Sequence, residues 1–492
     1  MNSPRYPSLY QINTRVYLTE LSRKLGRKAK LDDIPDTELK KLADQGFDWV
    51  WLLSVWQTGA AAKAISRSNA EWRRDFAQTL PDLADEDIGG SGFAITNYTV
   101  PRKLGGDAAL ERLRQRLSRL GLKLMLDFVP NHMAPDHPWV AEHPGYFVGG
   151  SEVDLARAPQ NYFRVPVGNA TQLFAHGRDP YFPGWPDTIQ LNYGNPALQK
   201  AMIGELQRIA GQCDGVRCDM AMLVLPEVFE RTWGISCQPF WPLAIKRVRS
   251  IHPSFVFMAE VYWDLEWTLQ QQGFNYCYDK RLYDRLREGH VNAIRDHLRA
   301  GLDYQDHLAR FLENHDEPRA AATFSPTVHR AAAVVTFFSP GLRFFHEGQF
   351  EGRQKRISPH LVRGPQEPVD ESLVAFYDRL LKAIRHPAVR EGRWWQIECR
   401  PAWNDNPSHE DLIAFAWESS IHDRLLIVVN YSNHQSQGRV PLPFSNLPGT
   451  SVRFEELIGA GTYDRDTSDL SANGLYVDLP AWGTHVFALK SN

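Results

Sequence analysis

The sequence has few cysteines and no excess of charge of either sign. It contains five cysteines in 492 residues. They form no CxxC pair and no Cys/His cluster, which argues against a disulfide framework and a structural zinc site. The net charge of −3 gives no support to nucleic acid or an anionic membrane as a partner. We therefore expect neither nucleic acid nor a membrane as a partner.

Long apolar runs are also missing. No stretch of about 18 uncharged apolar residues occurs, so the sequence predicts no transmembrane helix. The first residues, MNSPRYPSLYQ, show no basic region followed by an apolar run, and this predicts no signal peptide. Together with the cysteine usage, these features favour a cytoplasmic protein.

Short apolar runs alternate with amphipathic segments along most of the chain. The runs that read as strands lie at 8–18, 47–56, 122–130, the start of 215–222, 253–260, 307–314 and 342–348. Segments with helical spacing lie between them, at 36–46, 107–121, 196–212, 279–301, 329–341 and 370–386. Roughly eight strand–helix units of this kind predict an α/β protein, built on a parallel barrel or a doubly wound sheet.

The alternation of predicted strands and helices is interrupted by one long loop-rich segment, and it gives way to a different pattern near the end of the chain. Residues 133–195 are rich in Pro, Gly, Asp and aromatics, and a loop of this length inside a compact domain is typical of a functional insertion. After about residue 390 the chain turns to short alternating strands separated by turns. This part predicts a small antiparallel domain.

Polar residues follow four of the apolar runs, at the point where each run ends. The stretch GVRCD places Arg217 and Asp219 on one strand face, because residues i and i+2 point the same way. Alone, such a pair is more often a structural ion pair. Three other runs end in DFVPNH, AEVY and ENHDEPR. Barrel chemistry is assembled from the carboxyl ends of several strands, so the four ends together indicate one shared site.

The four stretches resemble the short conserved regions of the α-amylase family, glycoside hydrolase family 13, and they occur in that family's order. The resemblance implies a (β/α)8 TIM barrel with an insertion after the third strand and a C-terminal antiparallel β domain. The expected domains are the first part of the catalytic barrel at 1–132, a loop-rich insertion at 133–195, the second part of the barrel at 196–389 and a C-terminal β-sandwich at 390–492.

The resemblance also implies an activity. This is the retaining hydrolysis of α-glucosides in α-glucans or malto-oligosaccharides, through a covalent glycosyl-enzyme intermediate. Such chemistry needs two carboxyl groups about 5–5.5 Å apart, one of them ionised and the other holding a proton. Asp219 matches the nucleophile, Glu260 the acid and later base, and Asp316 the carboxylate that grips sugar hydroxyls. Arg217 beside Asp219 favours its charged form, and apolar neighbours would raise the pKa of Glu260.

Further site residues are implied by the same motifs. The expected substrate contacts are Arg217, His132, His315, Phe93, Tyr98 and Met222. The residues expected to support them are Asp127, Asn131, Asn314 and Arg319. Phe93 lies where many family members have a tyrosine that stacks on the reacting sugar. The alternative interpretation is that Phe93 only packs in the core. For His132 and His315 the alternative is a purely structural role.

Two departures from the family pattern bear on specificity and cofactors. Met222 and Leu223 replace a Lys-His pair found in many α-amylases, which predicts a less polar acceptor-side subsite. Gln190 lies where the family often has an aspartate that can bind calcium. Because calcium prefers several charged oxygens, we expect no metal and no cofactor, a standard calcium site included.

Two other functions stay open at this point. One is α-glucosyl transglycosylation or isomerisation of trehalose- or sucrose-type substrates, which depends on whether water or a sugar resolves the intermediate. The other is a non-catalytic carbohydrate-binding protein on the same fold. Proteins of that kind lose carboxylates, whereas Asp219, Glu260, Asp316 and Arg217 are all present.

Overall fold

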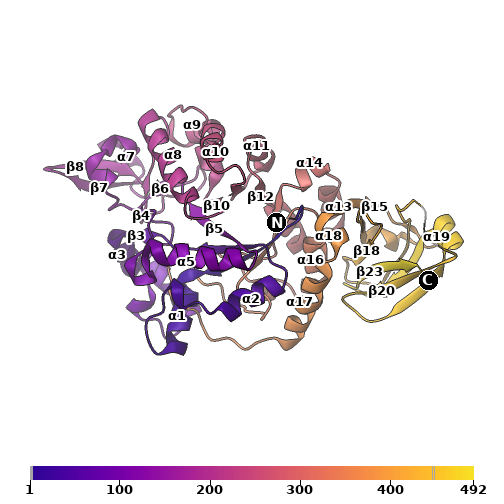
Figure 1. The fold of residues 1–492 in the computed structure, drawn as a ribbon. Helices are drawn as coiled ribbons and strands as arrows, with labels where there is room; N and C mark the ends of the chain where they lie inside the picture. Colours follow the sequence, from indigo (N-terminus) through magenta and orange to yellow (C-terminus); the bar gives the residue numbers. More distant parts are fainter. Residues whose placement is uncertain (1–3, 446, 448, 492) are drawn as a thin grey trace.

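A closed barrel of eight parallel strands forms the centre of the molecule (Figure 1). The structure is a computed structural model and describes residues 4–445, 447 and 449–491. In barrel order β1-β14-β13-β12-β11-β10-β5-β2, the strands are Ser8–Asn13, Leu342–His346, Leu308–Arg310, Tyr276–Tyr278, Val256–Ala259, Gly215–Cys218, Lys123–Phe128 and Trp49–Leu53. The closed order confirms the predicted barrel and excludes the doubly wound sheet.

Helices follow each barrel strand and cover the barrel's outside. They are α1 Thr14–Leu25, α2 Asp36–Asp44, α5 Gly106–Arg119, α8 Pro196–Ala210, α9 Pro226–Trp233, α10 Trp241–Arg249, α11 Glu266–Gln271, α12 Lys280–Glu288, α13 Val291–Leu298, α16 Pro326–Phe337 and α17 Glu371–Ile384. Helix α5 shows the pattern behind them. Its Leu110, Leu113 and Leu117 are buried, since their spacing places them on the one helix face that packs against the barrel.

Two excursions rise from the carboxyl ends of the strands. The insertion leaves through β6 His132–Met133 and returns through β9 Ile189–Gln190, which pair antiparallel. It carries α6 Trp139–Glu142, α7 Glu152–Arg157, β7 Tyr162–Val167 and β8 Ala170–Ala175. A smaller excursion after β2 holds α3 Ala60–Ser68 and α4 Ala70–Thr79 between the paired strands β3 Gln57–Thr58 and β4 Ile95–Asn97. Both lie near the end of the molecule opposite the C-terminal domain (Figure 1).

The C-terminal domain is built from two antiparallel sheets. The larger has the order β15-β17-β18-β23-β20-β21, with strands Arg393–Ile397, Leu412–Glu418, Arg424–Asn430, Thr484–Ser491, Ser451–Glu456 and Thr462–Asp466. The smaller contains β16 Arg400–Pro401, β19 Ser436–Val440 and β22 Leu475–Leu479, and α19 Thr467–Asn473 follows β21. An apolar core fills the space between the sheets.

One strand of the larger sheet serves two cores. In β17, Ile413, Phe415 and Trp417 belong to the core of the barrel, whereas the alternate residues Leu412 and Ala414 face the smaller sheet. The Trp417 indole Nε1 also donates to the Phe338 carbonyl at the end of α16, over 2.8 Å. The barrel and the C-terminal domain therefore share buried side chains.

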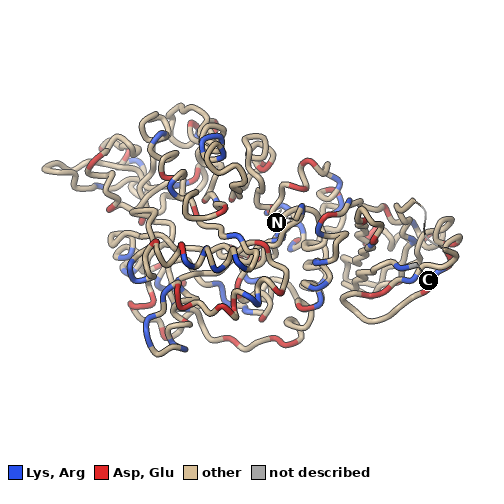
Figure 2. The backbone as a smooth tube through the Cα atoms, viewed as in Figure 1, with Lys and Arg blue, Asp and Glu red and all other residues tan. Residues whose placement is uncertain are grey.

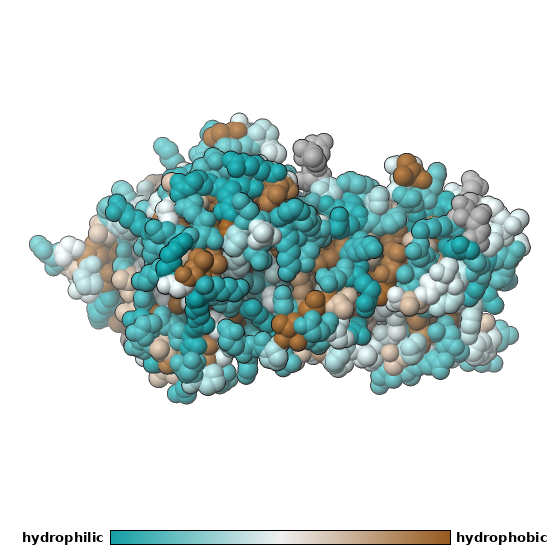
Figure 3. All heavy atoms as spheres, turned by 60° about the horizontal axis from the view of Figure 1, so that its bottom comes forward, coloured by the Kyte–Doolittle hydropathy of each residue, from teal (hydrophilic) through white to brown (hydrophobic). Residues whose placement is uncertain are grey.

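Charged residues are dispersed along the chain, and apolar residues are scattered over the face drawn in Figure 3. Lys and Arg are interspersed with Asp and Glu along the chain (Figure 2). The face drawn in Figure 3 is mainly hydrophilic and shows apolar residues as separate spots. Within the described part of the chain, none of the helices combines the length and the apolar character needed to cross a bilayer.

Candidate active site

Strand register brings the motif residues together at the carboxyl end of the barrel. Cys218 of β10 pairs with Ala259 of β11, so the residues that follow them, Asp219 and Glu260, leave neighbouring strands at the same level. They open onto a cleft of about 370 Å³. The cleft is lined by Trp72, Ser91, Phe93, His132, Trp185, Asp187, Thr188, Asp219, Met220, Glu260, Tyr262, Asp316, Arg356, Ser358, Pro359 and His360.

A single arginine holds two of the carboxylates. Arg217 is fully buried; its Nη1 donates to Asp219 Oδ1 over 2.6 Å and its Nη2 donates to Glu260 Oε2 over 2.6 Å. The sequence interpretation assigned Arg217 to Asp219 alone, and this was incomplete. Because one planar guanidinium reaches both groups, it fixes the orientation and spacing of the two carboxylates.

Glu260 lies in a more polar setting than the sequence suggested. Besides Arg217, its Oε2 accepts from the Met220 main-chain N–H over 2.8 Å, and its Oε1 accepts from the Tyr262 hydroxyl over 2.8 Å. The expected apolar neighbours are therefore only part of the surroundings of Glu260. Burial still raises the pKa of Glu260, and Arg217 offsets part of that shift. Burial likewise raises the pKa of Asp219, against the opposing charge and hydrogen bond of Arg217.

Asp316 differs from the other two carboxylates. Its side chain is 40% exposed, and its Oδ2 lies 3.0 Å from His315 Nε2. Partial burial acts to raise its pKa, but His315 together with Arg217 and Arg356 lowers it below the usual aspartate range. His315 is itself placed by Gln11, whose Nε2 lies 3.0 Å from His315 Nδ1. Of the three carboxyl groups Asp219, Glu260 and Asp316, Asp316 therefore has the lowest pKa.

Aromatic side chains from separate segments of the chain line the cleft. Phe93 lies 5.1 Å from the Arg217 guanidinium and 5.5 Å from the His315 ring. The close approach of its segment to β2 requires Gly92, since a Cβ there would lie 1.9 Å from Ser54 Oγ. On the insertion's side, His132 packs against Trp185 at 5.3 Å. Burial lowers the pKa of His132 to about 3, so this ring is neutral.

Asp127 and Asn314 support the cleft without lining it. Asp127 accepts from Trp51 Nε1 over 3.2 Å and from the Ser54 N–H over 3.1 Å, and lies 3.7 Å from Arg217. Asn314 Oδ1 accepts from the main-chain N–H of Asp316 over 2.8 Å, which fixes the turn that presents this carboxylate.

Arg319 stabilises the other end of the turn that carries Asp316. It donates to the buried Glu313 carboxylate and, over 2.8 Å, to the Glu347 carbonyl after β14. These contacts tie the loop that carries Asp316 to the neighbouring strand end.

Asn131 is hydrogen-bonded to Gln190 at the base of the insertion. Gln190 Nε2 donates to the Asn131 carbonyl over 2.9 Å and to Asn131 Oδ1 over 3.0 Å. Among the residues that the structure describes, no group of three or more His, Cys, Asp or Glu side chains is arranged to hold a metal ion.

Of the six predicted substrate contacts, Phe93 and His132 line the cleft, whereas Arg217 and His315 are buried against its carboxylates. The other two, Tyr98 and Met222, lie outside the cleft. Tyr98 is buried, and its hydroxyl donates to the Val129 carbonyl and accepts the Val129 N–H, so its role is structural. Met222 is also fully buried, as is most of Leu223. Their predicted place in the acceptor subsite is wrong because the chain reverses at Met220, which has a positive φ of 43° and itself lines the cleft.

Several lining residues were not foreseen from the sequence. Trp72 comes from α4, Trp185 and Asp187 from the insertion, and Arg356 and His360 from the segment after β14. These positions belong to irregular loops or to an added helix, where neither periodicity nor a motif marks them. Only the long Pro- and aromatic-rich insertion gave any indication of cleft residues.

The fold and the cleft define the class of the molecule: a (β/α)8-barrel protein with a carboxylate site at the carboxyl ends of its strands. Residues 37–367 match the family model of the α-amylase catalytic domain. Since this match covers more than half of the chain, the chain belongs to the α-amylase family.

Individual relatives are distant. The sequence is 22% identical over 398 residues to α-amylase MalA of Haloarcula japonica, covering 77% of this chain and 53% of that protein. It is 29% identical over 206 residues to trehalose synthase/amylase TreS of Mycobacterium tuberculosis, covering 37% and 32%. The chain thus spans about half, or less, of the length of these curated relatives.

A solved structure shares the whole architecture. The noncanonic maltogenic α-amylase AmyB from Thermotoga neapolitana aligns over 99% of both chains with a TM-score of 0.69 and 17% sequence identity. At this identity the likeness shows the fold alone.

Proposed function

We propose that the protein is a retaining α-glucoside hydrolase that acts on α-glucans or malto-oligosaccharides. The observation that carries the proposal is the Arg217 guanidinium, which donates to Asp219 and Glu260 over 2.6 Å each. The two carboxylates leave neighbouring strands, which lie about 4.8 Å apart, close to the about 5–5.5 Å needed for direct displacement.

The proposed reaction has two steps. Asp219 attacks the anomeric carbon and forms the glycosyl ester, while Glu260 gives its proton to the leaving glycosidic oxygen. Glu260 then takes a proton from water, the water oxygen attacks the anomeric carbon, and the bond to Asp219 breaks. Asp316, held at His315, stabilises the positive charge that develops on the sugar ring.

The stereochemistry of the first product tests the mechanism. Two inversions at the anomeric carbon release the α-anomer, whereas a single displacement by water releases the β-anomer. Proton NMR of a fresh malto-oligosaccharide digest, recorded before mutarotation, distinguishes the two. An initial β-product would overturn the roles of both residues.

Transfer to a sugar acceptor is the second candidate. It is supported by the relative described as a trehalose synthase/amylase and by the apolar Met220 and Trp185 side chains that line the cleft. The same digest, supplemented with excess glucose, separates the two reactions. Hydrolysis gives only shorter sugars, whereas transfer gives new disaccharides.

We further propose that the reaction proceeds without calcium, because the Gln190 amide donates to both Asn131 oxygens. The cytoplasmic location inferred from the sequence stays a prediction.

A further inference from the structure

Part of the cleft is lined by residues from α4 and from the segment after β14. We use the name donor-side wall for Trp72 of α4 together with Arg356, Ser358, Pro359 and His360 from the segment after β14, all of which line the cleft. None of these side chains belongs to the four motifs. The wall joins two parts of the chain that are almost 300 residues apart in sequence.

Contacts around His360 join the two parts of the wall. The His360 ring lies 4.7 Å from the ring of Trp72, and its Nδ1 lies 2.8 Å from Ser66 Oγ of α3. Thr79 Oγ1 donates to the Arg356 carbonyl over 3.1 Å. Beneath these contacts a separate apolar cluster includes Val16, Phe76, Leu80, Ile88, Ile357 and Leu361. The wall therefore has its own small core.

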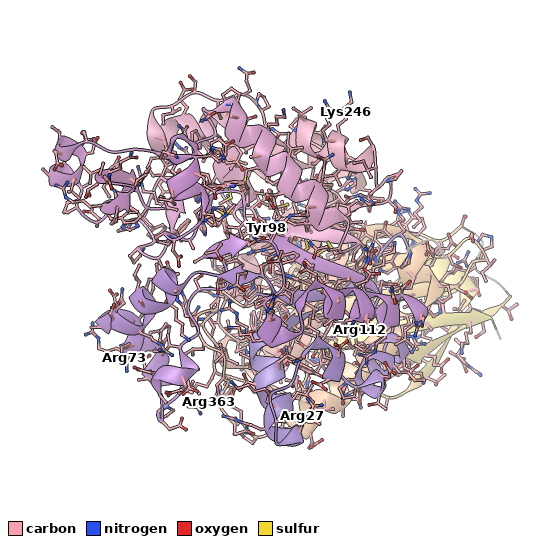
Figure 4. The ribbon with its side chains drawn as sticks, turned by 60° about the vertical axis from the view of Figure 1, so that its left-hand side comes forward. Arg27, Arg73, Tyr98, Arg112, Lys246 and Arg363 are labelled. Atoms are coloured by element: carbon pink, nitrogen blue, oxygen red, sulfur yellow. The ribbon has the colours of Figure 1, made fainter. Side chains whose placement is uncertain are left out.

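The wall is also tied to the segment that carries Phe93. Gly89 N–H donates to the His360 carbonyl over 2.8 Å, and a Cβ on Gly89 would lie 2.4 Å from Val362. Arg363 donates to both oxygens of Asp87 over 2.6 Å. Figure 4 shows Arg73 of α4 and Arg363 on the same part of the molecule, away from Lys246 of α10. These contacts pack the wall closely against the segment that carries Phe93.

Barrel topology sets which side of the reacting bond the wall occupies. The wall arises from the loops after β2 and β14, the two strands that flank β1. Strand β11, which presents Glu260, lies four places from β1 and thus on the opposite side of the barrel mouth. Glu260 protonates the leaving group, so the leaving sugar lies on its side. The wall consequently stands beyond the donor sugar, next to Phe93 and Asp316.

We propose that the enzyme is exo-acting and binds an α-glucan by its non-reducing end. In an α-1,4-glucan the chain beyond the donor sugar continues toward the non-reducing end. That continuation would run into Trp72, Arg356 and His360, so only a chain end fits on this side. The inference rests on the proposed function and names the part of the substrate that the cleft accepts.

The test compares maltoheptaose p-nitrophenyl glycosides with free and with blocked non-reducing ends. The block is an ethylidene acetal on O4 and O6 of the terminal glucose, and products are followed by chromatography. We expect the block to lower kcat/KM by about 100-fold or more, since small misplacements already cost about that much. Equal rates would overturn exo action. Inactivity on the free substrate as well would instead refute the proposed function.

A variant with an opened wall tests the assignment of residues. Trp72→Ala removes the ring that packs on His360, and it should raise the ratio of blocked to free rates by about tenfold, a change of about 1.4 kcal/mol in relative barrier. The matched control is Trp403→Ala, an exposed tryptophan (54%) in the C-terminal domain, which should leave the ratio unchanged. A ratio in Trp72→Ala equal to that of the control would overturn the role of the wall. If the variant does not fold, the wild-type comparison still decides between exo and endo action.

Discussion

Replacing Arg217 with methionine tests whether this residue is the shared counter-ion of the site. Arg217 is fully buried, donates to Asp219 and Glu260 over 2.6 Å each, and lies 3.7 Å from Asp127. Methionine keeps much of the volume but leaves these carboxyl groups without a cation. Removing one partner from a buried ion pair costs about 3–5 kcal/mol. We therefore expect a marked loss of stability at neutral pH, along with loss of activity.

The loss of stability in Arg217→Met should be larger at high pH than at low pH. Burial already raises the pKa of Asp219 and of Glu260, and without Arg217 both would rise further. A carboxyl whose pKa is higher in the folded than in the unfolded state stabilises at low pH, and this stability is lost as pH rises through the folded pKa. Between about pH 5 and pH 7.5 the free energy of unfolding falls by at most about 3.5 kcal/mol per carboxyl, at about 1.4 kcal/mol per pH unit.

Urea unfolding of the wild type and the variant at the two pH values measures the effect. The matched control is Arg343→Met, another fully buried arginine. Arg343 donates to the main-chain carbonyls of Tyr6, Phe337 and Val389, so its loss should cost about the same at both pH values. If Arg217→Met is no more destabilised near pH 7.5 than near pH 5, the shared counter-ion argument fails.

Three further predictions concern catalysis and metal. Asp219→Asn should lower turnover by at least about 1,000-fold while circular dichroism stays that of the wild type; a folded variant with near-normal rates would remove Asp219 as the nucleophile. Tyr262→Phe deletes the hydroxyl that donates to Glu260, which should raise the pKa of Glu260 and move the basic limb of the kcat–pH profile up by about one unit; an unmoved limb would count against Glu260 as the acid. Exhaustive chelation with EDTA should leave rate and Tm unchanged, and a loss restored by calcium would contradict the interpretation of Gln190.

The barrel and its reactive groups could be predicted because strand ends leave a local signature. Asp219 and Glu260 each follow an apolar run directly, so motif and strand coincide in the sequence. Element boundaries were less visible. The predicted strand at 8–18 ends at Asn13, whose side chain accepts from the Val16 N–H and starts α1. The sixth strand, Tyr276–Tyr278, was missed because three residues show no period.

The supporting geometry could not be predicted, because it depends on contacts between distant segments. Nothing in the sequence around Arg356 or His360 indicates that α4 packs against them. Likewise, the positive φ of Met220, which removes Met222 from the cleft, follows from the turn that brings its N–H to Glu260. Loop residues of this kind carry no periodic signal, and the motif positions alone do not place them.

The two-faced strand β17 has a consequence for how the molecule folds. Phe415 and Trp417 complete the core of a barrel whose own strands end at residue 346. During synthesis the core of the barrel therefore stays incomplete until the sheet that contains β17 has left the ribosome. Heat should then unfold both domains in one cooperative transition, since neither can separate without exposing the side chains they share. A fragment that ends before β15 would be an aggregation-prone barrel rather than a minimal enzyme.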